Sequence, residues 1–244
     1  MSRYKITIKY DGTNYFGWQI QSNKHTIQGE IEKALLPLNS DGRVQIVGAG
    51  RTDTGVHAFG QVAHFDLITR LAIDQLHNAI NARLPQDIQV ADLVKTDNEF
   101  HARYSAIKRH YNYQCYYGSN FLYSNQAWLI GKLKVNELNI IAKKIIGKHD
   151  FRSFSKLSKD IDNTICEIFQ SEWDENKNML TFKICGNRFL HHMVRYLVGT
   201  MIAIAEGKLN IEEFLNLLNN PQDNVKLFKS PSQGLILMRI DYEN

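Results

Sequence analysis

The spacing of apolar residues changes along the chain between a period of two and a period of about four, and this change most constrains the fold. Residues 4–10, YKITIKY, alternate apolar and polar side chains, which predicts a β-strand with one buried face. Further strands are predicted in RVQIVGAG, QVAHFDL, IKRHYNYQCYYG, NTICEIFQ, MLTFKICG and GLILMRIDY. The pair NTICEIFQ and MLTFKICG is expected to be antiparallel across the turn-prone residues 174–178.

Apolar residues three and four apart predict helices between these strands. Two helices are expected to end at prolines: one from about residue 26 to Pro37, and one over residues 73–84 before Pro85. NELNIIAKKIIG is a third, the run from Phe189 to Gly207 is the longest, and residues 211–218 form the last. The predicted fold class is therefore α/β of the α+β type. We expect two domains of mixed, mostly antiparallel sheet with packed helices, residues 1–105 and 106–244.

The composition narrows the cellular setting. The sequence has no run of about 18 apolar residues, and its first ten residues alternate charged and apolar side chains, so neither a membrane span nor a signal peptide is expected. The three cysteines, Cys115, Cys166 and Cys185, lie far apart and form no C-x-x-C pair, which argues against a zinc site or a disulfide framework. A cytoplasmic protein without metal is expected.

Basic residues are concentrated in one segment. The net charge is only +4, but residues 101–160 hold 11 Lys and Arg against 3 Asp and Glu. Within FHARYSAIKRHYNYQCYY, the cations Arg103 and Arg109 alternate with tyrosines. Cations can hold phosphates and aromatic rings can stack on bases, so this segment suggests nucleic-acid binding. A solvated basic surface would give the same pattern.

The stretch GAGRTDTGVHAFG, residues 48–60, contains one acid, Asp53, between turn-forming residues. Its Asp-Thr-Gly triplet resembles an aspartic protease loop, but that mechanism needs two carboxylates that share a proton. A dinucleotide-binding glycine motif is disfavoured because Asp53 occupies the position of its third glycine. An ordinary turn remains the simplest local interpretation.

Arg195 is the second polar candidate, on the long helix predicted from Phe189. His192, Arg195 and Gly199 fall three and four residues apart, opposite the apolar stripe of Met193 and Leu197. Arg195 could be a surface cation. An arginine packed among apolar neighbours usually pairs with a carboxylate, however, and Asp53 has no evident local partner.

These elements together resemble the tRNA pseudouridine synthase A family. The resemblance rests on YDGTNYFGWQIQ, TIQGEIEKAL, GAGRTDTGVHAFGQVAHF, INARLPQDI, FHARYSAIKRHYNY, DFRSFSK, NRFLHHMVRYLVG and SPSQGLIL, which span nearly the whole chain in order. The central G-R-T-D-x-G-V-H-A element is specific to these synthases, and Thr54 creates the protease-like triplet by accident.

The resemblance implies an enzyme that isomerises uridine to pseudouridine in the anticodon stem-loop of tRNA, at tRNA positions 38, 39 and 40. It implies two α/β domains with a basic cleft between them (the pseudouridine synthase fold), a homodimer, and no cofactor. It also assigns roles to residues: Asp53 is the nucleophile, Arg51 assists base flipping, Tyr111 is the active-site tyrosine, Arg195 pairs with Asp53, and Leu235 lines the pocket. Further tRNA contacts are expected from Phe100, His101, Arg103 and Arg109.

Two alternatives stay open from the sequence. One is a noncatalytic RNA-binding protein, which would be expected to have lost its acid. The other is the same chemistry on other uridines or another RNA. The sequence also leaves open whether Asp53 attacks the sugar, attacks the ring, or removes a ribose proton.

Overall fold

The computed structural model describes residues 1–118, 121–157 and 163–243 and divides the chain into two compact units. Unit 1 comprises Met1–Ile107 and Ile236–Asn244, and unit 2 comprises Lys108–Leu235. The expected domains were 1–105 and 106–244, so the units differ from them chiefly at the C-terminus. The last strand of the chain packs with the N-terminal unit.

Unit 1 is built on a sheet with the strand order β4-β1-β3-β10. β1 (Ser2–Tyr10) is antiparallel to both β3 (His57–Leu67) and β4 (Ile88–Lys95). β10 (Leu235–Tyr242) is parallel to β3, with Ile236 opposite His57, and the short β2 (Val47–Gly48) also pairs with β3. The non-local pairing of β10 explains why the C-terminus belongs to unit 1.

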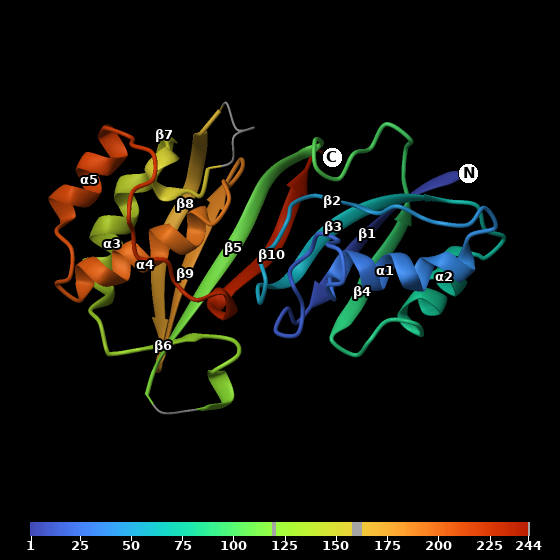
Figure 1. The fold of residues 1–244 in the computed structure, drawn as a ribbon, viewed down its shortest axis with the longest axis horizontal. Helices are drawn as coiled ribbons and strands as arrows, with labels where there is room; N and C mark the ends of the chain where they lie inside the picture. The colour runs from blue at the N-terminus through green and yellow to red at the C-terminus, as the bar shows by residue number, and fades with distance from the viewer. Residues whose placement is uncertain (119–120, 158–162, 244) are drawn as a thin grey trace. The chain divides into compact units, whose positions relative to one another are not determined.

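Two helices cover one face of this sheet (Figure 1). They are α1 (Ile27–Leu35), followed by a 3-10 turn over Leu36–Leu38, and α2 (Ile73–Asn81). The Thr26 hydroxyl accepts a hydrogen bond from the Gly29 amide and so caps α1, which begins close to the predicted residue 26. The alternating apolar residues of β1 are buried, as expected, beneath the helix residues Ile27, Ile31, Leu35, Leu76 and Ile80. Burial of each such side chain contributes roughly 1.5–3 kcal/mol.

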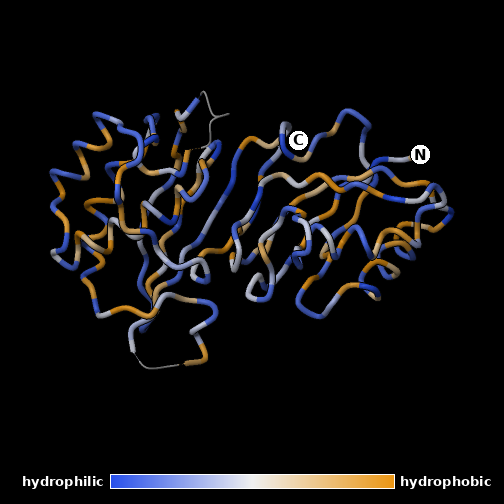
Figure 2. The backbone as a smooth tube through the Cα atoms, viewed as in Figure 1, coloured by the Kyte–Doolittle hydropathy of each residue, from blue (hydrophilic) through white to orange (hydrophobic). Residues whose placement is uncertain are grey.

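Unit 2 has a sheet with the order β5-β9-β8-β7. β5 (Ala106–Tyr117), β9 (Met179–Gly186), β8 (Ile165–Asn176) and β7 (Gly147–Asp150) pair antiparallel, and β6 (Trp128–Ile130) runs parallel to β5. The predicted hairpin of β8 and β9 is confirmed. Most of β5 is hydrophilic (Figure 2), yet Tyr113, Cys115 and Tyr117 are buried on one of its faces.

Helices α3 (Val135–Ala142), α4 (Met193–Ala205) and α5 (Ile211–Asn219) complete unit 2. Short 3-10 turns lie at Phe121–Tyr123, Lys143–Ile145, Arg152–Phe154 and Ser232–Gly234. α3 packs on β8, where the Asn139 side chain bonds both the N–H and the C=O of Trp173, at 2.8 Å each. The N–H and C=O of Trp173 lie beyond the part of β8 that pairs with β7, and the Asn139 side chain supplies their hydrogen-bond partners.

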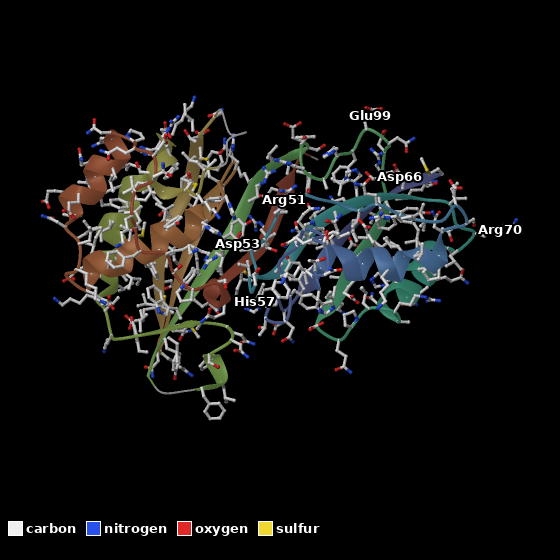
Figure 3. The ribbon with its side chains drawn as sticks, in the orientation of Figure 1. Arg51, Asp53, His57, Asp66, Arg70 and Glu99 are labelled. Atoms are coloured by element: carbon white, nitrogen blue, oxygen red, sulfur yellow. The ribbon has the colours of Figure 1, made fainter. Side chains whose placement is uncertain are left out.

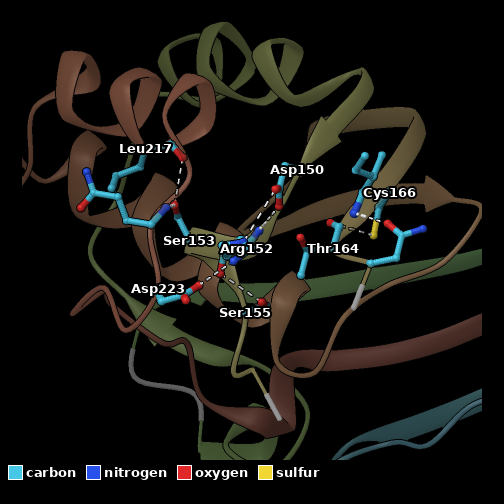
Figure 4. A network of polar contacts seen from close by, with 11 residues as sticks. Asp150, Arg152, Ser153, Ser155, Thr164, Cys166, Leu217 and Asp223 are labelled. Atoms are coloured by element: carbon cyan, nitrogen blue, oxygen red, sulfur yellow. Dashed lines mark hydrogen bonds and ion pairs between the residues drawn. The ribbon is translucent and has the colours of Figure 1, made fainter. Parts of the chain in front are cut away.

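The segment after β7 is tied to α5 through one buried serine (Figure 4). The Ser153 hydroxyl donates to the Leu217 carbonyl at 3.0 Å and accepts from the Gln222 amide at 2.8 Å. Arg152 lies between Asp150 and Asp223, at 3.8 and 3.4 Å. The sequence DFRSFSK therefore joins the strand edge of unit 2 to its last helix.

Three local predictions were wrong. The long helix begins at Met193 rather than Phe189, because His192 has φ +64° and cannot continue a right-handed helix. Of RVQIVGAG, only Val47 and Gly48 form a strand. The strand β4 was not predicted, because the alternation of its buried residues Ile88 and Val90 breaks before the next one, Leu93. No helix in the described part of the chain is long and apolar enough to cross a membrane.

Candidate active site

The loop that carries Asp53 leads directly into β3 and is held by backbone contacts. The Asp53 carbonyl accepts a hydrogen bond from the Val56 amide at 3.1 Å, which closes a turn, and Gly55 completes that turn with φ +76°. Thr52 is buried, Asp53 is half-buried, and Arg51 is exposed. The loop thus presents a carboxylate and a guanidinium from neighbouring positions.

A second loop, residues 11–18, packs against the Asp53 loop. The Trp18 amide donates to the Thr52 carbonyl at 3.1 Å, and the Gly55 amide donates to the Tyr15 carbonyl at 3.3 Å. Gly17, at φ +82°, lies so close that a Cβ there would stand 2.6 Å from the Thr52 oxygen. The buried hydroxyls of Tyr10 and Thr52 are 2.8 Å apart. The motif YDGTNYFGW therefore fixes the backbone on which Asp53 sits.

The same packing brings Asp11 and His57 together. The Gly12 amide donates to Nδ1 of His57 at 3.1 Å, and an Asp11 oxygen lies 3.1 Å from the same nitrogen. Burial raises the pKa of Asp11, but hydrogen bonds from Thr13 and the nearby His57 outweigh it, so the net pKa is lowered. Asp11 is therefore an anion at the base of the Asp53 loop. In Figure 3, His57 lies at the Asp53 end of β3 and Asp66 at the other.

Phe100, His101 and Arg103 lie on a different loop of unit 1, after β4. Phe100 contacts His64 and Tyr242 through ring centroids 6.1 and 5.1 Å away. His101 is half-buried and Arg103 is exposed. His64, which this loop contacts, lies seven residues along β3 from His57, roughly 23 Å at the usual rise per residue. These three predicted contacts are therefore distant from Asp53 within unit 1.

Tyr111 and Arg109 lie on β5 of unit 2. Tyr111 is half-buried opposite Ile184 of β9, and its ring meets Phe189 edge-on, with centroids 5.3 Å apart. Two residues earlier, the Arg109 guanidinium donates to the Asn187 carbonyl at 2.6 Å. The ring of Tyr111 is thus carried on β5, next to β9, and packs against a second aromatic ring.

Arg195 contacts the segment 228–235, and Leu235 is the last residue of that segment. The Arg195 Nε donates to the Ser230 carbonyl at 2.9 Å, and the Ser230 amide donates back to the Arg195 carbonyl at 3.1 Å. This pair of bonds orients the side chain while its two terminal nitrogens carry the N–H groups suited to a carboxylate. Leu235 is 7 % exposed and follows Gly234, where a Cβ would stand 2.7 Å from the Tyr113 ring.

Some cations of the basic segment 101–160 contact other side chains of unit 2. Lys108 lies over the Phe169 ring, Lys134 pairs with Glu137, and Arg152 contacts Asp150 and Asp223. These three cations thus have partners within unit 2.

A hollow of about 560 Å³ lies on the face of unit 2's sheet opposite its buried tyrosines. It contains no residue predicted for the site, and the ion pair of Lys183 with Asp174, at 3.0 Å, crosses it. Its lining is Asn112, Gln114, Tyr116, Tyr123, Asp174, Asn176, Lys177, Asn178, Met179, Thr181 and Lys183.

The sequence matches the tRNA pseudouridine synthase family over residues 6–105 and 141–243. The chain belongs to this family. As a family member, it carries Asp53, Arg195 and Leu235 within the matched stretches, whereas Tyr111 and Arg109 fall between them. The predicted family and the mixed α+β fold class are confirmed.

Curated relatives cover almost the entire synthase-family chain. The tRNA pseudouridine synthase A of Geobacillus sp. (strain WCH70) is 36% identical over 245 residues, which are 99% of each chain. That of Bacillus subtilis (strain 168) is 36% identical over 254 residues, 99% of this chain and 100% of the relative. That of Ruminiclostridium cellulolyticum (strain ATCC 35319 / DSM 5812 / JCM 6584 / H10) is 39% identical over 247 residues, with 99% and 100% covered.

Sequence reasoning missed the supporting residues of the synthase-family site. Gly12 and Gly17 lie against the backbone of another segment and Tyr10 bonds the Thr52 hydroxyl, and nothing in their own spacing identifies these partners. A signal was present in the two glycines of YDGTNYFGW, because a loop with glycines five apart is suited to close backbone contact.

Proposed function

We propose that this chain isomerises uridine to pseudouridine in the anticodon stem-loop of tRNAs, with Asp53 as the catalytic nucleophile. Membership of the tRNA pseudouridine synthase family supports the reaction and the tRNA substrate. The observation that carries the proposal is that Asp53, the acid of the family's central motif, is half-buried on a loop whose backbone is held by hydrogen bonds.

The reaction makes particular demands on the site. The bond from the ribose to uracil nitrogen must break, the base must turn, and a bond to carbon 5 must form while the uracil stays trapped. A stacked base cannot do this, so the nucleotide must leave the stack at a cost of a few kcal/mol. Exposed Arg51, two residues before Asp53, is suited to fill the space left by the base or to hold its phosphate.

Arg195 and Tyr111 supply the remaining chemistry in this proposal. Pairing with Arg195 would keep Asp53 ionised when the site excludes water, because desolvation alone opposes the charged carboxylate. The bond from its Nε to Ser230 supports this role by fixing the direction of the guanidinium. Tyr111 offers a ring face for the uracil and a phenol for the carbon 5 proton, and Leu235 lines the pocket.

The remaining expectations belong to the same proposal. Phe100, His101, Arg103 and Arg109 contact the tRNA, the protein acts as a cytoplasmic homodimer, and catalysis needs no metal or organic cofactor. Sedimentation of the purified protein tests the dimer directly, since a monomeric mass at working concentration would contradict it.

The decisive experiment compares Asp53→Asn and Asp53→Ala with the parent on unmodified tRNA. We expect both variants to form no pseudouridine, while tRNA affinity stays within about tenfold because phosphate contacts dominate binding. Exposed Asp97, which lies outside the Asp53 loop, gives the control Asp97→Asn, which should retain the parent rate. Turnover by Asp53→Ala in a preparation free of host enzyme would remove Asp53 as the nucleophile.

The target uridines need a separate measurement. Mapping pseudouridine in RNA from cells with and without the protein should show loss at tRNA positions 38, 39 and 40. If pseudouridine were lost only at other uridines, the proposed reaction would stand and the proposed target in the anticodon stem-loop would be wrong.

A further inference from the structure

Tyr104 presents a solvent-exposed aromatic ring on unit 1. Tyr104 is 77% exposed. Its ring stacks on that of His101, with centroids 4.3 Å apart and an angle of 29° between the planes. The Arg103 guanidinium carbon lies 5.7 Å from the centroid of the same ring. An exposed ring beside a cation has the two features that single-stranded nucleic-acid sites combine.

The support beneath Tyr104 is ordered. Nδ1 of His101 accepts hydrogen bonds from the amides of Arg103 and Tyr104, both at 3.2 Å. The next layer is His64, whose ring centroid lies 4.8 Å from that of His101 and whose Nδ1 accepts from the Ala102 amide at 3.1 Å. A stacking face that is already fixed loses little conformational entropy when a ligand binds.

The same loop is anchored at its other side. The Tyr242 hydroxyl donates to the Ala102 carbonyl at 2.8 Å, and the Lys5 ammonium lies 4.6 Å from the Tyr242 ring centroid and 5.3 Å from that of Phe100. Lys5 therefore adds a second cation close to the loop. These contacts hold the loop that carries the exposed Tyr104 ring.

Two other tyrosines of the basic segment, Tyr111 and Tyr113, differ from Tyr104. Tyr113 is fully buried and its hydroxyl donates to the Pro231 carbonyl at 2.7 Å. Tyr111 is half-buried and packed edge-on against Phe189. Among these three rings, Tyr104 is the one whose exposure suits stacking on a base from solvent.

We propose that Tyr104 and Arg103 form a binding site for an unpaired nucleotide of the tRNA other than the target uridine, with its base stacked on Tyr104 and its phosphate on Arg103. This inference rests on the proposed function. The site contacts the part of β3 that is roughly 23 Å from the start of the strand, where the Asp53 loop ends. At about 3.4 Å per stacked nucleotide, several nucleotides separate the two positions.

The test compares Tyr104→Ala with Tyr104→Phe and with Phe121→Ala, a control at another exposed aromatic residue, 76% exposed. Stacking of a base contributes about 1–3 kcal/mol, so Tyr104→Ala should weaken tRNA binding by about 5- to 150-fold. Tyr104→Phe and Phe121→Ala should stay within about twofold of the parent. Because the site is remote from the chemistry, Tyr104→Ala should raise KM and leave kcat unchanged.

Photocrosslinking locates the contact. Transcribed tRNA with 5-iodouridine in place of uridine should crosslink to the peptide that contains Tyr104, and this crosslink should be absent from Tyr104→Ala. Unchanged affinity of Tyr104→Ala, or equal losses in Tyr104→Phe and Tyr104→Ala, would overturn the stacking site. A lower molecular mass of Tyr104→Ala in solution would also overturn it, because Tyr104 would then contact a second protein chain.

These outcomes are separate from the fate of the proposed function. If the parent protein binds tRNA and forms no pseudouridine, the proposed function fails whatever Tyr104 does. If the parent forms pseudouridine and Tyr104→Ala binds normally, the stacking site alone fails.

Discussion

Gly17 shows how a residue without a functional group can determine the position of a candidate catalytic one. Its φ of +82° is unfavourable for other residues, and a Cβ would lie 2.6 Å from the Thr52 carbonyl, next to Asp53. A larger residue would have to push the Asp53 loop away. Errors of about 1 Å in the position of a catalytic group can lower the rate about 100-fold. Substitution of Gly17 should therefore impair catalysis by displacing Asp53.

Tyr111 can be tested by removing only its hydroxyl. Tyr111→Phe keeps the ring that packs on Phe189, so the strand and the stacking face should persist. If the phenol moves the carbon 5 proton, single-turnover product formation should fall by about 100-fold or more with little change in tRNA affinity. Tyr116→Phe, on the other face of β5, is the control. A near-parental rate for Tyr111→Phe would leave Tyr111 with a stacking role alone.

His64 predicts an acid-sensitive contribution to stability. Burial lowers its pKa from 6.5 to about 4, and nearby His101 and Arg3 act in the same direction. Because the folded pKa lies below the unfolded one, the contribution is complete above pH 6.5 and is lost as the pH falls toward 4. Between pH 7 and pH 5 we expect a loss of about 2 kcal/mol from the free energy of unfolding.

Denaturant unfolding at these two pH values measures the His64 contribution. His64→Asn should reduce the difference between the two free energies by most of that amount, whereas His25→Asn, at a half-exposed imidazole, should not. An unchanged difference in His64→Asn would assign the acid sensitivity to another group.

At the scale of elements, Ser153 makes a prediction about how α5 is held. Ser153→Ala removes the hydroxyl that bonds both the Leu217 carbonyl and the Gln222 amide, and it leaves two partly buried groups unpaired. The free energy of unfolding should fall by about 1–3 kcal/mol. Ser155 provides the matched control, since its hydroxyl donates to the Arg152 carbonyl in its own turn. Equal losses in the two variants would refute the tie between this segment and α5.

Local pattern predicted most elements of the fold, and its failures have physical causes. The residues Ile27, Ile31 and Leu35 identified α1 because one face of that helix is wholly buried. The start of α4 was misplaced because the apolar spacing continues through His192, while a left-handed backbone there breaks the helix. The pairing of β10 with β3 joins residues about 180 positions apart, and periodicity carries no information about such partners.

The candidate site was predicted by a different route. The local spacing of residues identified Asp53 only as a turn residue. The order of motifs along the chain, which resembles a known family, suggested its catalytic role. What the sequence did not reveal is the support: the backbone bonds of Trp18 and Gly55 that hold the Asp53 loop, and the exposed face of Tyr104. Both depend on contacts between segments distant in sequence.

For the molecule as a whole, the net charge of +4 says little about RNA binding, because individual cations have different partners. Arg152 lies between two carboxylates in unit 2, whereas Arg103 lies over an exposed tyrosine in unit 1. Only cations that neutralise phosphates release counterions when tRNA binds. The salt dependence of binding therefore separates the functional cations from the structural ones.

We expect Arg103→Ala and Arg109→Ala each to make the slope of log affinity against log salt shallower by roughly 0.7 to 0.9, similarly for different tRNAs. Arg195→Ala should lower turnover and leave the slope nearly unchanged, because its proposed partner is a carboxylate of the protein. Lys134→Ala, which removes a cation already paired with Glu137, is the control. Binding of two tRNAs at several salt concentrations measures all four variants beside the parent. Unchanged slopes for Arg103→Ala and Arg109→Ala would return those arginines to a solvated surface, and a large change for Arg195→Ala would mean that Arg195 binds a phosphate instead of Asp53.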